Sequence, residues 1–530
     1  MSAASSVPSP NETATSMKTK AQTQTQSIKA AKVKGGGGGG GENRAAVIAL
    51  LQQCDPTEHG NALLFAALHH DNVRFDHGSQ SWLIRQKHFW SPDTKAFVYQ
   101  LMSETTDWRA RNAPLLANGD SSPDPKTIKA INAHRGWARQ SKSYRVAQNS
   151  LAWAEKLPAL ATDLTKWDAD PWVLGTPDGV YDLPSGKLAP TTAVTERYVS
   201  LLTSVSPVMK DCPMWRDFLD KATGGDKALQ SYLQRLAGYC LTGSTREQSL
   251  IWFLGLGGNG KSTFLETLSA ILGTYAHTMR AEVLVAAKYE QHSTELCDLK
   301  GKRLVVTSET EQAKSWREAL LKRLSGSDTI TARRVHKDSI TFKPTHKLII
   351  AGNHAPQLSS VSEAERRRYQ MVHWNYTFKP LDDPTFETGK DIVRDDYFNQ
   401  KIEAEHGAIL HWAMLGAQEW FKEGLKPPDS VLLDSSEFLH EQDLFEEWLQ
   451  ECCERLPGAY AYTTQLFQNW HGWCQARGEF GGTQRAFTER LKQKGCKTDS
   501  IGREKKRIIV GLVLTNPDAN LVVPELPQPN

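Results

Sequence analysis

The feature that most constrains this chain is a glycine-rich loop between an apolar run and a helix-forming run. Ser249–Leu254 has strand character, and Gly255–Thr263 follows at once as GLGGNGKST. The spacing G-x-x-x-x-G-K-[ST] lets backbone N–H groups surround phosphate oxygens, while the helix expected over Phe264–Leu272 adds the positive end of its dipole. Lys261 is predicted to neutralise β- and γ-phosphate charge, and Ser262 to ligate Mg²⁺. ATP and Mg²⁺ are therefore the predicted cofactors, and the predicted nucleotide-binding residues are Gly255, Gly257, Gly258, Asn259, Gly260, Lys261, Ser262 and Thr263.

A phosphate loop needs an acidic partner, and the next predicted strand ends in two candidates. Arg303–Ser308 has strand character, and Glu309 and Glu311 follow it. A carboxylate at the carboxyl end of a neighbouring strand can hold Mg²⁺ and polarise the attacking water. Glu309 is the first choice, as catalytic acid and as a Mg²⁺ ligand beside Ser262, and Glu311 is the second. For either residue the alternative is a solvated loop acid.

Two later strands carry the remaining catalytic candidates. Asn353 follows the strand predicted over Lys347–Ala351 and could orient water near the γ-phosphate. Arg367 and Arg368 directly precede the strand predicted over Tyr369–Trp374, with Arg366 in reserve. An arginine there can act as a finger that stabilises transition-state charge, and a neighbouring subunit would supply it. The alternative is an ordinary surface arginine paired with a nearby glutamate.

Composition excludes several classes of protein. Lys and Arg number 63 against 60 Asp and Glu, which excludes a uniformly basic coat and leaves room for local basic patches. No apolar run approaches the ~18 residues that a membrane span needs, and the first residues lack a signal-peptide core. The eight cysteines form no C-x-x-C pair, so reduced thiols in a cytoplasmic protein, of a bacterium or a host cell, are expected.

Length and patterning divide the 530 residues into several parts. Residues 1–43 form a basic, glycine-rich tail with too little apolar surface to fold. Alternating strands and helices indicate an open α/β sheet in the ATPase core. The predicted parts are the tail 1–43, a mixed α/β module 44–205, a helical collar 206–245, the ATPase core 246–380, a helical segment 381–430 and a C-terminal domain 431–530.

The C-terminal domain has a helix, helix, basic helix, basic hairpin pattern. Leu444–Leu449 and Leu466–Trp473 each put apolar residues on one helix face, and Thr483–Lys494 is a third, basic helix. This order is that of a winged-helix domain, and a helical cap that docks a protein is the alternative. The predicted DNA-binding residues here are Arg485, Arg490, Arg503, Lys505 and Lys506.

The order of these motifs resembles the superfamily 3 helicases of the phage and plasmid primase–helicase kind, the group that includes the poxvirus primase-helicase. The resemblance covers about residues 70–515. The motifs that carry it are GNGKST at 258–263, GKRLVV at 301–306, LSGSDTITAR at 324–333, FKPT at 342–345, NHAP at 353–356, the arginine cluster, and upstream DADP at 168–171, GVYDLPSG at 179–186 and CPMW at 212–215.

The resemblance implies an AAA+-like core that assembles into a hexameric ring and moves along single-stranded DNA, typically 3′ to 5′, on single-stranded and forked substrates. It also implies a hairpin before the third motif that grips DNA, through Arg333, Arg334, His336 and Lys337. Relatives often carry a primase domain, but no zinc ribbon or nucleotidyl-transfer carboxylate cluster is evident in this sequence. A primase or polymerase acting in trans is therefore the expected partner.

Two functional hypotheses follow from the sequence. The first is an ATP-dependent replicative helicase of a phage, plasmid or mobile element. The second is a non-helicase AAA+ ATPase, such as an origin-binding initiator, a protein remodeller or a primase-accessory subunit without processive unwinding. The basic hairpin favours the first, because a remodeller more often places an aromatic residue at that position.

Overall fold

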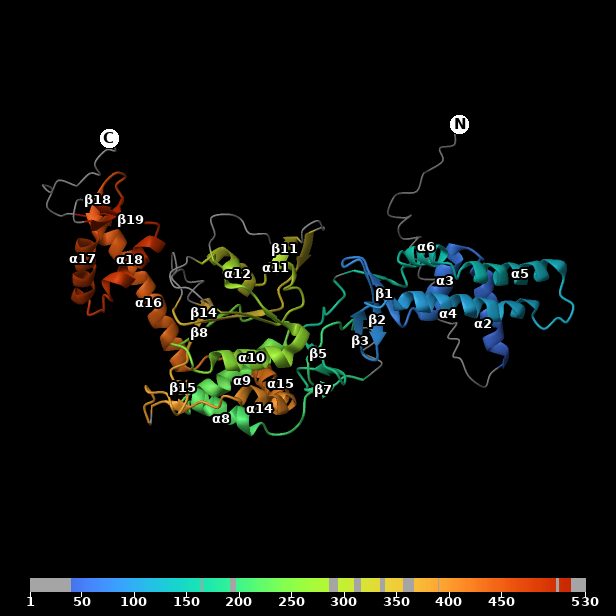
Figure 1. The fold of residues 1–530 in the computed structure, drawn as a ribbon, viewed down its shortest axis with the longest axis horizontal. Coiled ribbons are helices and arrows are strands. Elements are labelled where there is room, and N and C mark those ends of the chain that lie inside the picture. The colour runs from blue at the N-terminus through green and yellow to red at the C-terminus, as the bar shows by residue number, and fades with distance from the viewer. Residues whose placement is uncertain are drawn as a thin grey trace, which may run out of the picture. The chain divides into compact units, whose positions relative to one another are not determined.

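The computed structural model describes residues 40–163, 165–190, 197–285, 294–308, 316–333, 339–355, 367–388, 390–501 and 505–515 (Figure 1). It divides into two compact units. The first comprises residues up to Ala169 together with Pro190–Ser200, and the second comprises Asp170–Ala189 and the chain from Leu201. The module expected over 44–205 is thus shared, because residues 170–189 join the second unit.

The first unit packs helices against a small mixed sheet of order β3-β2-β1-β4. Strands β1 and β2 pair antiparallel, whereas β1 and β4 pair parallel. Its core joins Phe65 and Ala66 of one helix to Val73 and Ile84 of the sheet. The elements are α2 (Gly40–Gln53), α3 (Glu58–His69), β1 (Val73–Asp76), β2 (Ser81–Gln86), β3 (Phe89–Pro92), α4 (Phe97–Asn112), η1 (Ala113–Ala117), α5 (Pro125–Gln140), α6 (Tyr144–Ala154) and β4 (Ala161–Thr162).

A five-stranded parallel sheet forms the centre of the second unit, in the order β14-β8-β13-β10-β9. This confirms the predicted α/β fold and shows that its sheet is parallel. The strands are β8 (Leu250–Leu254), β9 (Ala276–Thr278), β10 (Leu304–Ser308), β13 (Lys347–Gly352) and β14 (Tyr369–His373). Because all five run the same way, their carboxyl ends meet at one edge of the sheet.

Both faces of this sheet are covered, which explains why its strands are continuously apolar. Ile251 and Phe253 of β8 face one core, and Leu250, Trp252 and Leu254 face the other. Figure 1 shows α9, α10 and α15 on one side and α12 with β11 on the other. The covering elements are α8 (Pro213–Ala222), α9 (Lys227–Leu241), α10 (Lys261–Leu272), η2 (Gly273–Tyr275), η3 (Ala281–Val283), α11 (Thr294–Cys297), α12 (Glu318–Ser325), β11 (Ile330–Arg333), β12 (Ser339–Phe342), β15 (Phe378–Lys379), β16 (Ile392–Val393), α14 (Phe398–Ile402), η4 (Glu403–Glu405) and α15 (His406–Glu423).

Two buried cations fasten neighbouring segments to the amino-terminal edge of the sheet. Arg303 precedes β10, donates to the carbonyls of Leu241 and Val173, and lies 4.3 Å from the centre of the Tyr275 ring. Lys347 begins β13 and donates to the carbonyl of Thr242. These carbonyls belong to the end of α9 and to β5 (Val173–Gly175), which forms a three-stranded sheet with β6 (Val180–Asp182) and β7 (Lys187–Leu188). The contacts explain why residues 170–189 pack with the parallel sheet.

The C-terminal part follows one long helix, α16 (Asp429–Cys452). Phe438 and Leu439 of α16 pack in a core of the parallel sheet, whereas Leu444 and Trp448 pack in a separate core. That second core belongs to a sheet of order β18-β20-β19 with two helices. The remaining elements are β17 (Cys453–Glu454), β18 (Tyr460–Tyr462), α17 (Thr463–Ala476), α18 (Gln484–Gln493), β19 (Lys497–Ile501), β20 (Lys506–Val510) and β21 (Val513–Leu514).

All eight cysteines are free thiols. Among the described helices, none is both long and apolar enough to cross a membrane.

Replacing Arg303 with Met should destabilise the second unit. The substitution leaves two buried carbonyls without their charged donor, which costs about 3 kcal/mol of unfolding free energy. Urea denaturation followed by tryptophan fluorescence measures the change in midpoint. Arg216→Met is the matched control, because Arg216 is exposed and pairs with the exposed Asp211 at 3.0 Å. Equal midpoints for the two variants would contradict the fastening role of Arg303.

Candidate nucleotide site

A cavity of about 550 Å³ opens at the carboxyl edge of the parallel sheet. One wall is the glycine-rich loop with the start of α10, and the ends of β10 and β13 contribute Ser308 and Asn353. In open α/β sheets, ligands bind outside the carboxyl ends of the strands where the strand order reverses. Here β8 has β13 on one side and β14 on the other, although β9 and β10 come between β8 and β13 in the chain. The fold therefore places this cavity where such sheets hold ligands.

Backbone geometry requires glycine at several positions of the loop. Gly257, Gly258 and Gly260 have φ values of 103°, 62° and 87°, the region that side chains disfavour. A Cβ on Gly260 would also lie 2.9 Å from the Phe218 ring. Gly260 is the residue before α10, so the loop turns directly into the helix. The first residues of α10, Lys261, Ser262 and Thr263, line the cavity, and N–H groups in the first turn of a helix have no partner within the helix.

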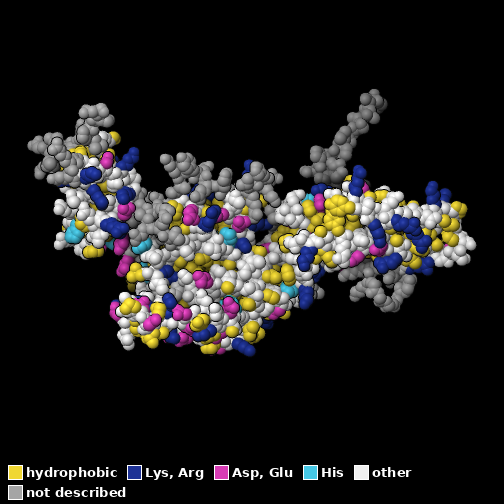
Figure 2. Space-filling model, in the orientation of Figure 1, with side chains coloured by type: hydrophobic (Ala, Val, Ile, Leu, Met, Phe, Trp, Pro, Cys, Tyr) yellow, Lys and Arg dark blue, Asp and Glu magenta, His cyan; other side chains and the backbone are white. Residues whose placement is uncertain are grey.

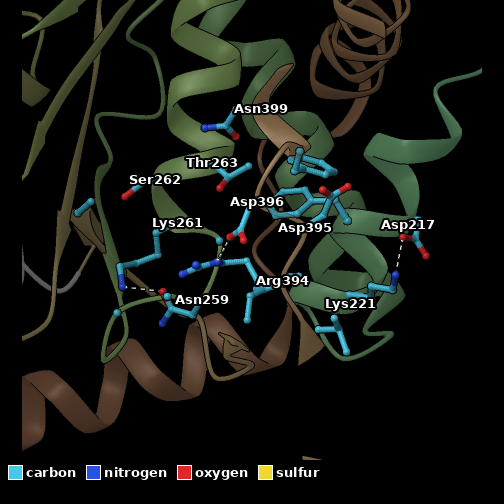
Figure 3. A pocket seen from close by; sticks show the side chains of 18 of the residues that line it. Asp217, Lys221, Asn259, Lys261, Ser262, Thr263, Arg394, Asp395, Asp396 and Asn399 are labelled. Atoms are coloured by element: carbon cyan, nitrogen blue, oxygen red, sulfur yellow. Dashed lines mark hydrogen bonds and ion pairs between the residues drawn. The ribbon is translucent and has the colours of Figure 1, made fainter. Parts of the chain in front are cut away.

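Lys261 is a buried cation held by oxygens of its own loop. Its Nζ donates to the Gly255 carbonyl at 2.7 Å and to Asn259 Oδ1 at 2.8 Å. Burial lowers the pKa of the Lys261 ammonium below its usual value. Asn259 in turn donates to the Trp374 carbonyl at 2.6 Å, just beyond β14. Figure 3 shows the hydrogen bond between Lys261 and Asn259.

Asn259 connects Lys261 to the chain that follows β14. The sequence motif places no requirement on this residue, yet its side chain is 3% exposed and bridges the lysine to the chain after β14. Its amide orients the lysine by hydrogen bonding and carries no charge. An anion that enters the cavity thus meets a lysine whose positive charge no carboxylate of the described chain contacts.

Of the other predicted catalytic residues, one lines the cavity, others lie outside the described residues, and Arg367 and Arg368 lie elsewhere in the structure. Asn353 lines the cavity with Lys261. Glu309 and Glu311 lie outside the described residues, as does Arg366, so their roles remain predictions. Oxygen donors suited to Mg²⁺ are present in the cavity, because Ser262 and Ser308 both line it. The described residues contain no cluster of three His, Cys, Asp or Glu side chains that could hold a metal ion.

Arg367 and Arg368 do not line the cavity of their own chain. They precede β14, so they lie at the opposite end of a parallel strand from the loop. Arg368 donates to the Lys322 carbonyl at 3.0 Å and to Gln248 Oε1 at 3.2 Å. Within one chain, the structure does not bring these arginines to the lysine.

Sequence reasoning missed an aromatic surface that lines the cavity next to the glycine-rich loop, where the Phe218 ring lies against Gly260. Helix α8 contributes Phe218, and the segment after β14 contributes Phe378 and Phe398. The rings of Phe218 and Phe378 stack at 5.9 Å and 28°, and those of Phe218 and Phe398 lie 5.3 Å apart. These phenylalanines follow no catalytic motif, so only the fold reveals that they face the loop.

Polar groups accompany the aromatic wall. Arg394 lines the cavity and pairs with Asp396, with Nε 2.7 Å from Oδ1. Lys221 pairs with Asp217 at 2.7 Å. Figure 3 shows the Arg394–Asp396 pair between the loop and α8. The cavity thus combines a cationic loop with an adjoining aromatic, mixed-charge surface.

The hairpin candidates lie only partly within the described residues. Strands β11 and β12 pair antiparallel with Arg333 opposite Ser339, which confirms the predicted hairpin strands. Arg334, His336 and Lys337 lie outside the described residues.

The C-terminal candidates are mostly exposed. Arg485, Lys505 and Lys506 are exposed, whereas Arg490 is partly buried between Glu441 and the Phe445 ring. Arg503 lies outside the described residues. Arg490 therefore has a packing role that its place in a basic helix did not predict.

Two family models match parts of the chain. Residues 62–224 match the model described as D5 N terminal like, and residues 253–368 match one described as a family of unknown function (DUF5906). The second match includes the glycine-rich loop and ends at Arg368.

Two viral proteins whose names carry the word helicase are similar to the chain. The protein of Acanthamoeba polyphaga mimivirus is 25% identical over 59% of this chain and 34% of its own length. The protein of Frog virus 3 (isolate Goorha) is 24% identical over 49% of this chain and 28% of its own length. The chain therefore spans about a third of the length of these curated relatives.

Solved structures of the NrS-1 C terminal region also align with the chain. Two apo structures cover 86% and 85% of it, and 99% of their own chains, at 12% and 13% identity with TM-scores of 0.39 and 0.40. The motif order, the D5 N terminal like segment and the helicase-named viral proteins together identify the chain as a relative of the primase-helicase family.

Proposed function

We propose that this chain is an ATP-dependent DNA helicase that translocates on single-stranded DNA as a ring, in the replication of a phage, plasmid or mobile element. The observation that carries the proposal is the cavity of about 550 Å³ at the carboxyl edge of the sheet, which both Lys261 and Asn353 line. Ligand sites of this kind range from ~300 to 1,000 Å³. Relationship to helicase-named proteins supports the same assignment.

In this proposal the two ends of the cavity take different parts of ATP. The triphosphate lies on the loop, where Lys261 leaves its loop oxygens for the β- and γ-phosphates. Ser262 and Glu309 would hold Mg²⁺, which would supply positive charge against the phosphates. The base packs against Phe378 and Phe398, since an aromatic surface favours a flat heterocycle. Asn353 then orients the attacking water.

A neighbouring subunit would complete this AAA+-like site. Arg367 and Arg368 lie at the amino-terminal edge of the sheet, away from the cavity of their own chain. In a ring, the arginines of one subunit could reach the glycine-rich loop of the next subunit, which they do not reach in their own chain. A hexamer is the ring size that the family resemblance implies.

Two parts of the second unit would contact DNA. The hairpin of β11 and β12, with Arg333 at its end and Arg334, His336 and Lys337 beyond, would grip a single strand in the ring. The C-terminal part consists, in chain order, of α16, β17, β18, α17, α18, β19, β20 and β21. Two helices followed by the antiparallel β19–β20 hairpin support a winged-helix domain. Arg485, Lys505 and Lys506 would then face duplex DNA.

One observation keeps a second function in view. The C-terminal part has its own core, separate from those of the sheet. Such a module suits an AAA+ initiator or primase-accessory ATPase that binds duplex DNA without processive unwinding. The two functions differ in strand displacement, which only a helicase performs.

Replacing Phe378 or Phe398 with Ala should weaken ATP binding without stopping chemistry. Loss of a stacking surface should raise KM for ATP about tenfold, while kcat stays within about twofold. Inhibition by inorganic tripolyphosphate, which has no base, should not change. Leu381→Ala is the control, because Leu381 is 70% exposed on the same segment and does not line the cavity. An unchanged KM in both phenylalanine variants would remove the aromatic wall from nucleotide binding.

Mixing two inactive variants should restore ATP hydrolysis. A Lys261→Ala protein lacks the loop cation, and an Arg367→Ala/Arg368→Ala protein lacks the finger. In mixed rings, some interfaces pair an intact loop with intact arginines, so hydrolysis returns in part. Lys261→Ala mixed with Ser262→Ala is the control, because both changes affect the same side of the interface. If subunits exchange and hydrolysis does not return, the arginines do not act in trans.

A further inference from the structure

The first unit carries a strongly basic surface that the proposed ATPase does not use. Residues 125–154, which form α5 and α6, contain six Lys and Arg and no Asp or Glu. The six are Lys126, Lys129, Arg135, Arg139, Lys142 and Arg145. Figure 2 shows Lys and Arg side chains gathered over α5.

Most of these cations are exposed and lack an acidic partner. Lys142 pairs with Asp107 at 2.7 Å. For Arg135, Arg139 and Arg145, the described chain offers no ion pair, and all three side chains are exposed. Surface arginines in a chain with nearly equal numbers of acids and bases usually have acids nearby, so this stretch is locally unbalanced.

An exposed aromatic ring lies among these cations. Tyr144 begins α6, is 68% exposed and stacks on Tyr99 with ring centres 5.6 Å apart and planes inclined by 14°. Trp153, 51% exposed, lies farther along α6. Figure 2 shows hydrophobic side chains gathered over α6. We define the α5–α6 corner as Arg135, Arg139, Lys142, Tyr144 and Arg145.

The corner is fixed by the core beneath it. The buried Asn61 amide donates to Ser141 Oγ at 2.8 Å, which holds the turn between α5 and α6 against α3. Beneath α5, the buried Arg109 guanidinium donates to the Cys54 carbonyl and contacts His134 Nδ1 at 2.8 Å. Burial lowers the pKa of Arg109 to about 10, so it is still charged at neutral pH. A buried cation thus adds to the positive potential of the surface.

We propose that the α5–α6 corner binds single-stranded DNA, with its arginines on phosphates and a base stacked on Tyr144. A positively charged surface with exposed aromatic rings is the arrangement that binds unpaired strands, because every base has a flat face and every phosphate a charge. Duplex DNA would use the arginines alone, since its bases are already stacked. The site requires no ATP hydrolysis, so it stands apart from the proposed helicase mechanism.

Salt-dependent binding to the full chain tests the corner. Fluorescence anisotropy with labelled oligothymidylate, without nucleotide, measures Kd from low to moderate KCl. Arg135→Gln/Arg139→Gln/Arg145→Gln should raise Kd on the order of tenfold and reduce the salt slope by about 2, since each phosphate contact contributes ~0.7. The control Lys187→Gln/Arg216→Gln/Lys422→Gln removes the same charge from exposed positions of the second unit.

Tyr144 separates stacking from charge. Tyr144→Ala should raise Kd for the single strand about tenfold with the salt slope unchanged, whereas Tyr144→Trp should retain affinity. Affinity for a duplex of the same length should not respond to either change.

Photocrosslinking gives a second, direct readout. With 5-iododeoxyuridine in the oligonucleotide, Tyr144 or Trp153 should carry the crosslink after digestion. The corner is overturned if no crosslink maps to residues 139–153, or if the arginine variant matches its control. A changed sedimentation coefficient with unchanged DNA binding would instead assign this surface to protein contacts. Basal ATPase should be unaffected in every variant, so failure of this site and failure of the ATPase are distinguishable.

Discussion

One buried cation organises the second unit. Lys261 must be close enough to the sheet to be buried and open enough to meet an anion, and only a loop of glycines allows the backbone to turn that tightly. Asn259 satisfies the lysine with a neutral oxygen and ties it to the chain after β14. Since the lysine lacks a carboxylate partner among the described residues, its charge is available to a phosphate group. The other groups that line the cavity lie around this lysine.

Parallel strands bring the remaining groups to the lysine. The loop, Ser308 and Asn353 come from different parts of the chain, and they meet because β8, β10 and β13 end at one edge. The same direction sends Arg367 and Arg368 to the far edge. A single constraint, strand direction, therefore accounts both for the assembled half of the site and for the half that we assign to a neighbour.

The sequence predicted four of the five strands and the helix α10 to within a few residues, because each of those strands is a short apolar run followed by a loop. It missed the edge strand β9, because Ala276–Thr278 is short and not apolar. It also predicted the glycine-rich loop at 255–263, because that motif is defined by the spacing of its glycines, lysine and serine. It could not predict the aromatic wall, because Phe218 and Phe378 are far apart in the chain and resemble ordinary core residues. Nor could it show that Arg490 packs against Phe445, because a basic helix looks the same whether its charges are paired or open.

We propose that ATP hydrolysis in this cavity drives strand separation. Displacement of a labelled strand from a forked DNA substrate measures it most directly, with ATP, with a non-hydrolysable analogue and with the Lys261→Ala protein. We expect displacement only when the intact protein hydrolyses ATP. Hydrolysis stimulated by DNA without any displacement, at protein concentrations that form rings, would contradict the helicase assignment and favour the initiator or accessory ATPase.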